Sequence, residues 1–235
     1  MKVELLNPDE CKKLFENWGK VASVCYDTKT SKPENIGKHC MNSGHTSGSR
    51  GTYFIFKVSE VSRSVVDQIA RHEIGVFKNV QSFRYVDKDN FAYAIPKEIE
   101  SNNDLLNIYL SHMDNTMQLY SEIQDYVQEK TGNKERANEQ ARYVLPMSTH
   151  SSFVIGFDIE ALIHFMHKRL CVRAEDITRQ VAIAMKKEVL KVLPELEDKL
   201  VPHCQYLMWC PESKGCGAYP SKKELKERLK NDRQS

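Results

Sequence analysis

Four features that would assign this chain of 235 residues to a class at once are missing from it. No apolar run reaches the roughly 18 residues that a membrane-spanning helix needs, so we expect no membrane partner. The 34 Lys and Arg residues are nearly balanced by 32 Asp and Glu residues, which argues against a dedicated nucleic-acid surface. Without a CxxC pair the common zinc and redox signatures are missing, and without a GxGxxG motif a Rossmann cofactor domain is not supported.

The seven cysteines are an odd number spread along the chain, which indicates free thiols in a reducing compartment. The charged N-terminal residues do not resemble a secretory signal, so we expect a cytoplasmic protein. Near the C-terminus, His203, Cys204, Cys210 and Cys216 are residues of the types that bind zinc. The five-residue gaps between these cysteines are not a standard zinc-finger spacing, so packed thiols without a metal are the favoured interpretation and a zinc site is the alternative.

Residues 61–85 carry the densest set of side chains that could have a function, and their first half predicts a helix. Val61, Val65 and Ile69 recur at a spacing of four, which places them on one helical face. Gly75 is a plausible end for this helix, because glycine tolerates the left-handed conformation that often terminates helices.

The second half of this stretch, residues 76–85, is rich in β-branched and aromatic residues and predicts an extended segment. If it is extended, Ser82 and Arg84 point the same way, because side chains alternate along a strand. The stretch thus offers an amide, two guanidiniums, an imidazole and a hydroxyl, from Gln68, Arg71, Arg84, His72 and Ser82. Such a set suits a phosphorylated, planar ligand, although Arg and His near a helix end commonly only cap carbonyls or face solvent.

The remaining patterns predict strands and long helices, and therefore an α+β fold with a mixed sheet flanked by long helices. Strands are expected over residues 52–58 and 151–156, and helices over residues 105–127, 134–145, 159–170 and 174–193. Ser101 or Asn102 can cap the first of these helices, Gly132 can end it, and Asp158 can cap the third. We expect one domain over residues 1–220 and a charged, flexible tail over residues 221–235.

One stretch of the chain contains Arg71-His72, Ile74-Gly75-Val76, Asn79 and Ser82-x-Arg84-Tyr85. Together these residues resemble the signature of the flavin-dependent thymidylate synthase family. Further matches are Gly44-His45-x-Ser47, Arg142 within Ala-Arg-x-Val-Leu-Pro, Leu162-x-His164-Phe165, and Arg169. The resemblance implies a homotetramer that shares its active sites between chains. It also implies reductive methylation of dUMP to dTMP, with FAD, NADPH and 5,10-methylenetetrahydrofolate as cofactors and carbon donor.

The resemblance also implies a role for each matching residue. Arg169 would be catalytic, because a guanidinium that stays protonated can stabilise negative charge developing on the uracil ring. The residues implied for dUMP binding are Gln68, Arg71, Gln81, Ser82, Phe83, Arg84, Arg142 and Arg169. Those implied for FAD binding are Ser47, Arg71, His72, Glu73, Asn79, Asp158 and His164.

Four places depart from the family pattern, all on the flavin side of the implied site. Glu73 and Glu160 stand where the family has arginine, Asp158 stands where it has asparagine, and Arg50-Gly51 stands where it has Glu-His. An alternative function is therefore a relative that binds nucleotide or flavin but has lost or changed the methylation. A third, an interaction protein built on the same scaffold, predicts loss of the arginines that bind the nucleotide, and these are present.

Overall fold

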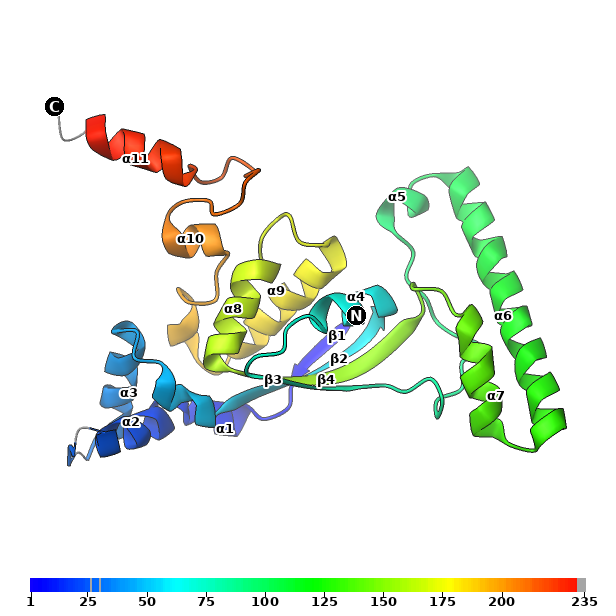
Figure 1. Ribbon diagram of the computed structural model, residues 1–235, viewed down its shortest axis with the longest axis horizontal. Helices are drawn as coiled ribbons and strands as arrows, with labels where there is room; N and C mark the ends of the chain where they lie inside the picture. Colours follow the sequence, from blue (N-terminus) through cyan, green and yellow to red (C-terminus); the bar gives the residue numbers. More distant parts are fainter. Residues whose placement is uncertain (26, 30, 232–235) are drawn as a thin grey trace. The chain divides into compact units, whose positions relative to one another are not determined.

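The computed structural model describes residues 1–25, 27–29 and 31–231, and its strands form one sheet. The strands are β1 (Lys2–Leu5), β2 (Tyr53–Ser62), β3 (Val76–Val80) and β4 (His150–Asp158). Their order in the sheet is β1-β2-β4-β3 (Figure 1).

Backbone hydrogen bonds show that neighbouring strands run antiparallel. Beside β3 and β4, Gln81 N donates to Ser152 O and Asp158 N donates to Gly75 O, so the residue number rises on one strand as it falls on the other. At the ends of β2 and β4, Arg63 N likewise donates to Thr149 O. The expected mixed sheet is therefore wrong. Alternating helices and strands in the sequence carry no information about the direction in which two distant strands pair.

Helices make up most of the remaining regular structure, which confirms the α+β class. The α-helices are α1 (Pro8–Lys12), α2 (Leu14–Cys25), α3 (Pro33–Asn42), α4 (Arg63–Ile69), α5 (Lys97–Glu100), α6 (Asn103–Thr131), α7 (Lys134–Ala141), α8 (Ile159–Arg169), α9 (Asp176–Leu190), α10 (His203–Leu207) and α11 (Lys222–Asn231). The 3-10 helices are η1 (Ser47–Gly51), η2 (Arg142–Val144) and η3 (Pro194–Leu196).

Two compact units account for the described chain. The first contains Met1–Lys2, Val58–Ala70 and Asn79–Phe153, and the second contains Val3–Lys57, Arg71–Lys78 and Val154–Ser235. Each unit is described by itself below. The single domain expected over residues 1–220 stays a prediction.

The first unit is dominated by α6, whose ends confirm the sequence interpretation. The Asn102 side chain accepts hydrogen bonds from Asp104 N and Leu105 N, both at 3.1 Å, and so caps the first turn. Gly132 ends the helix with a φ of 64°. Helix α7 packs beside α6 in the same unit (Figure 1), and Gln124 on α6 donates to the buried Asn138 on α7 at 2.6 Å.

The second unit has an aromatic core between its part of the sheet and α8. Phe54 and Phe56 alternate with less buried residues along β2, as one face of a strand requires. Phe157 at the end of β4 packs against Phe165 on α8, with ring centroids 5.0 Å apart. The same unit contains the closely packed pair α2 and α3, in which Gly19 and Gly37 each face backbone atoms of the other helix or its flank.

The helix predicted from residue 61 is shorter than expected. Val61 belongs to β2, and α4 begins at Arg63 and ends at Ile69, well before Gly75. Gly75 instead lies in the turn that enters β3, with a φ of 70°. The spacing of Val61, Val65 and Ile69 resembled one helical face because the end of β2 and α4 both bury apolar side chains in the same unit.

Two other segments also differ from the sequence expectations. Residues 33–42 form α3, which is not among the helices expected from the sequence. The tail expected to be flexible contains α11, and its start has a capping box: Ser221 N donates to the Glu224 carboxylate at 2.6 Å, and Glu224 N donates to the Ser221 hydroxyl at 3.3 Å. The four residues after Asn231 lie outside the described part of the chain.

None of the described helices is both long enough and apolar enough to cross a membrane.

The contact between α2 and α3 generates a stability prediction. A Cβ at Gly19 would lie 1.7 Å from the carbonyl oxygen of Pro33, a backbone atom that cannot rotate away. We expect Gly19→Ala to lower the free energy of unfolding by about 1–3 kcal/mol, the usual cost of overpacking. Gly51→Ala is the control, because among the described residues no atom would lie within 4 Å of a Cβ at that position. Equal urea midpoints for the two variants would contradict this account.

Candidate active site

A cavity of about 640 Å³ in the second unit brings together five of the residues expected at the flavin side. The turn before β3 forms one wall and the first half of α8 forms another. The expected residues that line it are Arg71, His72, Glu73, Asp158 and His164, and the others are Arg50, Ile74, Gly75, Val76, Glu160 and Ala161. Residues 71–76 and 158–164 are distant in sequence, so the fold and not the chain order creates this grouping.

Asp158 fixes the geometry of this cavity. Its Oδ1 accepts a hydrogen bond from Ala161 N at 2.8 Å and so caps α8, as the sequence predicts. Its backbone N donates to Gly75 O at 2.9 Å. A Cβ at Gly75 would lie 2.3 Å from Asp158 Oδ2, so glycine is required at this position by both its positive φ and the close carboxylate.

His72 and Arg169 are hydrogen-bonded in the second unit. Arg169 Nε donates to His72 Nε2 at 3.1 Å, and the His72 ring packs against Phe165 with centroids 5.0 Å apart. Burial, and then the Arg169 charge, lower the pKa of His72 to about 4. The imidazole is therefore neutral at pH 7 and can accept this bond. Burial followed by the nearby Arg71 lowers the pKa of Arg169, which indicates two guanidiniums close enough to repel each other.

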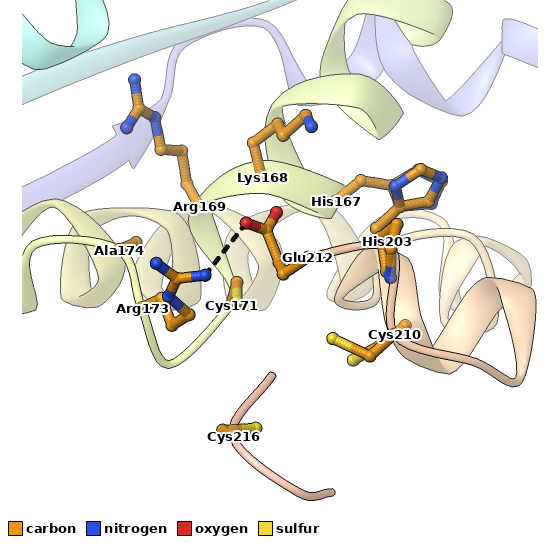
Figure 2. A pocket seen from close by; sticks show the side chains of 12 residues that line it. His167, Lys168, Arg169, Cys171, Arg173, Ala174, His203, Cys210, Glu212 and Cys216 are labelled. Atoms are coloured by element: carbon orange, nitrogen blue, oxygen red, sulfur yellow. Dashed lines mark hydrogen bonds and ion pairs between the residues drawn. The ribbon is translucent and has the colours of Figure 1, made fainter. Parts of the chain in front are cut away.

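Arg169 also lines a second cavity, of about 240 Å³, beside the C-terminal segment (Figure 2). Its side chain points away from Cys210 and Cys216 in this view. Arg173 holds residues 212–214 of this segment, because its Nη1 donates hydrogen bonds to Glu212 Oε2 at 3.2 Å and to Lys214 O at 2.8 Å.

The cysteines of this second cavity are free thiols from four places in the chain: Cys171, Cys204, Cys210 and Cys216. Burial is the main cause of a raised pKa for Cys204, so its thiol stays protonated at neutral pH. Within the described residues, no three His, Cys, Asp or Glu side chains are arranged to hold a metal ion.

A third cavity, of about 500 Å³, lies in the first unit and gathers four residues expected to bind dUMP. Its expected lining residues are Gln81, Ser82, Phe83 and Arg142, and it is completed by Arg63, Val80 and Tyr143. Two cations face the Phe83 ring: Arg63 at 5.7 Å and Lys88 at 4.7 Å from its centroid. Lys88 also donates to Gln81 Oε1 at 3.3 Å. Among the described residues, Arg63 and Arg142 line the cavity and no carboxylate does, so its lining is positively charged, which suits a phosphate, while Arg63 also pairs with Asp67 Oδ1 at 3.7 Å outside the lining.

Arg63 and Lys88 were missed by the sequence interpretation. Arg63 begins α4, where a positive charge is unfavourable because the N-terminus of a helix is already partially positive. A cation at such a position indicates a role other than stabilising the helix. The sequence did not show this, because the helix was expected to include Val61 and so to begin before Arg63. We find no comparable sequence signal for Lys88, whose position comes from the tertiary structure.

The segment that carries Ser82 and Arg84 is not extended. Residues 83–85 form a turn in which Tyr85 N and Val86 N both donate to Ser82 O. Arg84 pairs instead with two carboxylates on α7, those of Glu135 and Glu139, the latter at 2.9 Å. The extended segment expected over residues 76–85 is therefore wrong after Val80, because a local turn replaces the strand, and the condition under which Ser82 and Arg84 would share one direction is not met.

Three other expected site residues lie elsewhere. Gln68 is half-buried on α4, Asn79 is exposed on β3, and Ser47 is exposed in η1. In the part of the chain that the structure describes, none of them lines the cavities above. Their roles stay predictions.

A family described as "Thymidylate synthase complementing protein" matches residues 11–195 of this chain. The chain belongs to this family. A flavin-dependent thymidylate synthase of Nitratidesulfovibrio vulgaris is 35% identical over 187 residues, which cover 79% of this chain and 76% of the relative. A protein of the same name from Clostridium tetani is 33% identical over 214 residues, 87% of this chain and 85% of the relative. The resemblance inferred from the motifs is thus confirmed.

A solved structure supports the fold of this family member independently. The crystal structure of thymidylate synthase X from Helicobacter pylori, which holds FAD and dUMP, matches with a TM-score of 0.58. It covers 79% of this chain and 94% of its own, at 17% sequence identity. At that identity the match shows the fold.

The contact between His72 and Arg169 predicts the titration of His72. We expect His72 to titrate at about 4 in the folded protein, and nearer its ordinary value of 6.5 in Arg169→Ala, which loses one cause of the shift while burial remains. The unfolded chain binds the proton at higher pH than the folded chain, so this group reduces stability as the pH falls from 6.5 towards 4. Nitrogen-15 NMR of the imidazole, assigned with His72→Gln, measures both values. A pKa at or above 6.5 in the folded wild type would refute the assignment.

Proposed function

We propose that this chain is a flavin-dependent thymidylate synthase, which converts dUMP to dTMP by reductive methylation. The curated relatives carry this name. The observation that carries the proposal is the positively charged cavity in which Gln81, Ser82 and Arg142 meet, because it suits the phosphate of the nucleotide that the resemblance implies.

FAD is the flavin that we assign to the cavity beside α8, and the residues there fit it. The cavity volume of about 640 Å³ is typical of sites for cofactors of this size. Ile74, Val76 and Ala161 offer an apolar surface for a planar ring, and Arg50 and Arg71 offer positive charge for a diphosphate. FAD would supply the reducing equivalents, while the protein orients the reactants.

For dUMP we propose that the phosphate binds in the first unit. Arg142 can hold a phosphate through two N–H groups, and the Ser82 hydroxyl and Gln81 amide can donate further hydrogen bonds. Arg84 would join this set only by leaving or sharing its two carboxylate partners on α7.

Arg169 is our candidate for the residue that stabilises charge on the uracil. Half-buried beside Arg71, its guanidinium has a strong electrostatic preference for a nearby anion. The bond to His72 fixes its orientation before any substrate arrives.

The further reactants and the assembly are part of the same proposal. NADPH would reduce the flavin, and 5,10-methylenetetrahydrofolate would supply the carbon. We also propose a homotetramer with shared active sites, supported by exposed apolar side chains on α6 such as Leu105, Ile108 and Tyr126. The cytoplasmic location stays a prediction.

A second candidate function is a family member that binds the nucleotide or flavin but has changed its chemistry. It is favoured by the carboxylates of Glu73, Asp158 and Glu160, all of which line the cavity that we assign to FAD. An anionic wall is unfavourable for a diphosphate unless the carboxylates are paired.

The first test is the absorbance spectrum of the purified protein, followed by an assay. We expect flavin bands, directly or after addition of FAD, and dTMP formation from dUMP with NADPH and the folate donor. Omission of dUMP should abolish product. Protein that cannot be loaded with flavin would overturn the proposal, and loaded protein that makes no dTMP would favour the second candidate.

The second test is Arg169→Ala. We expect turnover to fall at least about a hundredfold, as for loss of one preorganised electrostatic contact, while circular dichroism stays unchanged. Arg228→Ala, on the exposed surface of α11, is the control and should keep its activity. Near-normal kcat for Arg169→Ala would contradict its assigned role.

A further inference from the structure

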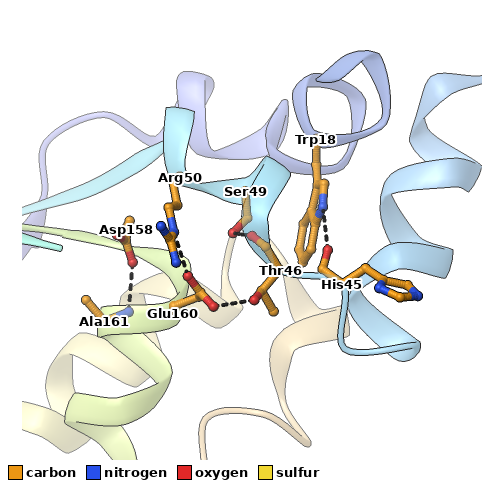
Figure 3. A network of polar contacts seen from close by, with 8 residues as sticks. All are labelled: Trp18, His45, Thr46, Ser49, Arg50, Asp158, Glu160 and Ala161. Atoms are coloured by element: carbon orange, nitrogen blue, oxygen red, sulfur yellow. Dashed lines mark hydrogen bonds and ion pairs between the residues drawn. The ribbon is translucent and has the colours of Figure 1, made fainter. Parts of the chain in front are cut away.

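Glu160 joins α8 to the segment that precedes β2 (Figure 3). Its Oε2 accepts from Arg50 Nε at 2.9 Å, and its Oε1 accepts from the Thr46 hydroxyl. Glu160 is in the first turn of α8, two residues after the capping Asp158. One carboxylate therefore holds two positions of residues 45–51 against the helix that borders the flavin-side cavity.

Residues 45–51 are also fixed from their other side. Trp18 Nε1 donates to His45 O at 3.2 Å, and the buried Ser49 hydroxyl donates to Thr46 O at 2.5 Å. A Cβ at Gly48 would lie 2.9 Å from the Trp18 ring. The backbone that carries Arg50 is thus held before any ligand binds, so little conformational entropy is lost when its side chain engages one.

The charges of the two partners are mutually stabilised. The Thr46 hydrogen bond first, and then Arg50, lower the pKa of Glu160, and Glu160 raises the pKa of Arg50. Glu160 is therefore ionised at neutral pH. The Arg50 side chain is still 67% exposed, so its charge also faces the open cavity that it lines.

The pair changes the electrostatics of the cavity wall. Of the three carboxylates there, Asp158 caps α8 and Glu160 is neutralised by Arg50. Arginine uses its Nε for Glu160, and its two Nη groups carry the other four of its five N–H donors. The cation thus comes from the segment before β2, and the carboxylate from α8. In the family pattern the two charges are exchanged, with Glu at the place of Arg50 and Arg at the place of Glu160.

We propose that Arg50 is the residue that binds the phosphate groups of the dinucleotide cofactor in this cavity, and that Glu160 is its positioning residue. The proposal rests on the proposed function, because it takes FAD as the ligand. It explains how a chain with a carboxylate at position 160 keeps a site for an anionic cofactor: the positive charge absent from α8 is supplied by Arg50, which contacts α8 from η1.

Binding of FAD and of riboflavin distinguishes this role, since riboflavin has the same ring without phosphates. We expect Arg50→Gln to raise the Kd for FAD at least about tenfold, the loss of one charge-assisted contact, and to leave the Kd for riboflavin within about twofold. Quenching of flavin fluorescence measures both values. Equal losses for the two ligands would show a merely structural role, and no loss for FAD would overturn the proposal.

Charge reversal tests the pair itself. We expect Arg50→Glu to weaken FAD binding, because it removes the cation and places a second carboxylate beside Glu160. Adding Glu160→Arg to this variant should recover most of the affinity, since the double variant restores the pair with its polarity exchanged. A double variant as weak as Arg50→Glu alone would remove Glu160 as the positioning residue.

These outcomes separate the inference from the function on which it rests. If wild-type protein binds FAD and forms dTMP while Arg50→Gln binds FAD equally well, the inference fails and the function stands. If wild-type protein binds neither FAD nor riboflavin, the proposed function fails, and the phosphate role of Arg50 fails with it.

Discussion

The buried carboxylate of Asp158 is the contact on which the flavin-side cavity depends. It ends β4, caps α8 and leaves room for only a hydrogen atom on the Cα of Gly75. An N-cap contributes about 1 kcal/mol to stability, but for the cavity the position of Asp158 matters more than this energy. By joining the turn before β3 to the start of α8, it places Arg71 and His72 on one wall of the cavity and Glu160 on the other.

How far the sequence predicted this fold depends on how local each signal was. Asn102, Gly132 and Asp158 act through backbone groups within four residues, and all three ends were predicted correctly. Direction of strand pairing and the early end of α4 depend on contacts between distant residues. The prediction of an extended segment after Ser82 was wrong for a different reason. The Ser82 carbonyl and hydroxyl accept hydrogen bonds from the backbone that follows, and such local bonds compete with a strand.

The candidate site was predicted by residue type better than by geometry. Gln81, Ser82, Phe83 and Arg142 do gather in one cavity, although the motifs that carry them are far apart in the sequence. The resemblance supplied this grouping, since periodicity alone gave no reason to bring Arg142 to Ser82. The resemblance was less informative at Arg50. In the sequence this residue was only a departure from the family pattern, whereas in the structure it pairs with Glu160, which is another such departure.

Helix α6 has a consequence for the protein at low concentration. Its 29 residues extend about 44 Å, yet against the described part of its own chain it buries only Met113, Thr116 and Tyr120. A helix gains most of its stability from the surface that covers its apolar face. If other copies of the chain provide that cover, dilution uncovers Leu105 and Ile108, and the melting temperature of the protein becomes a function of how much of it is present.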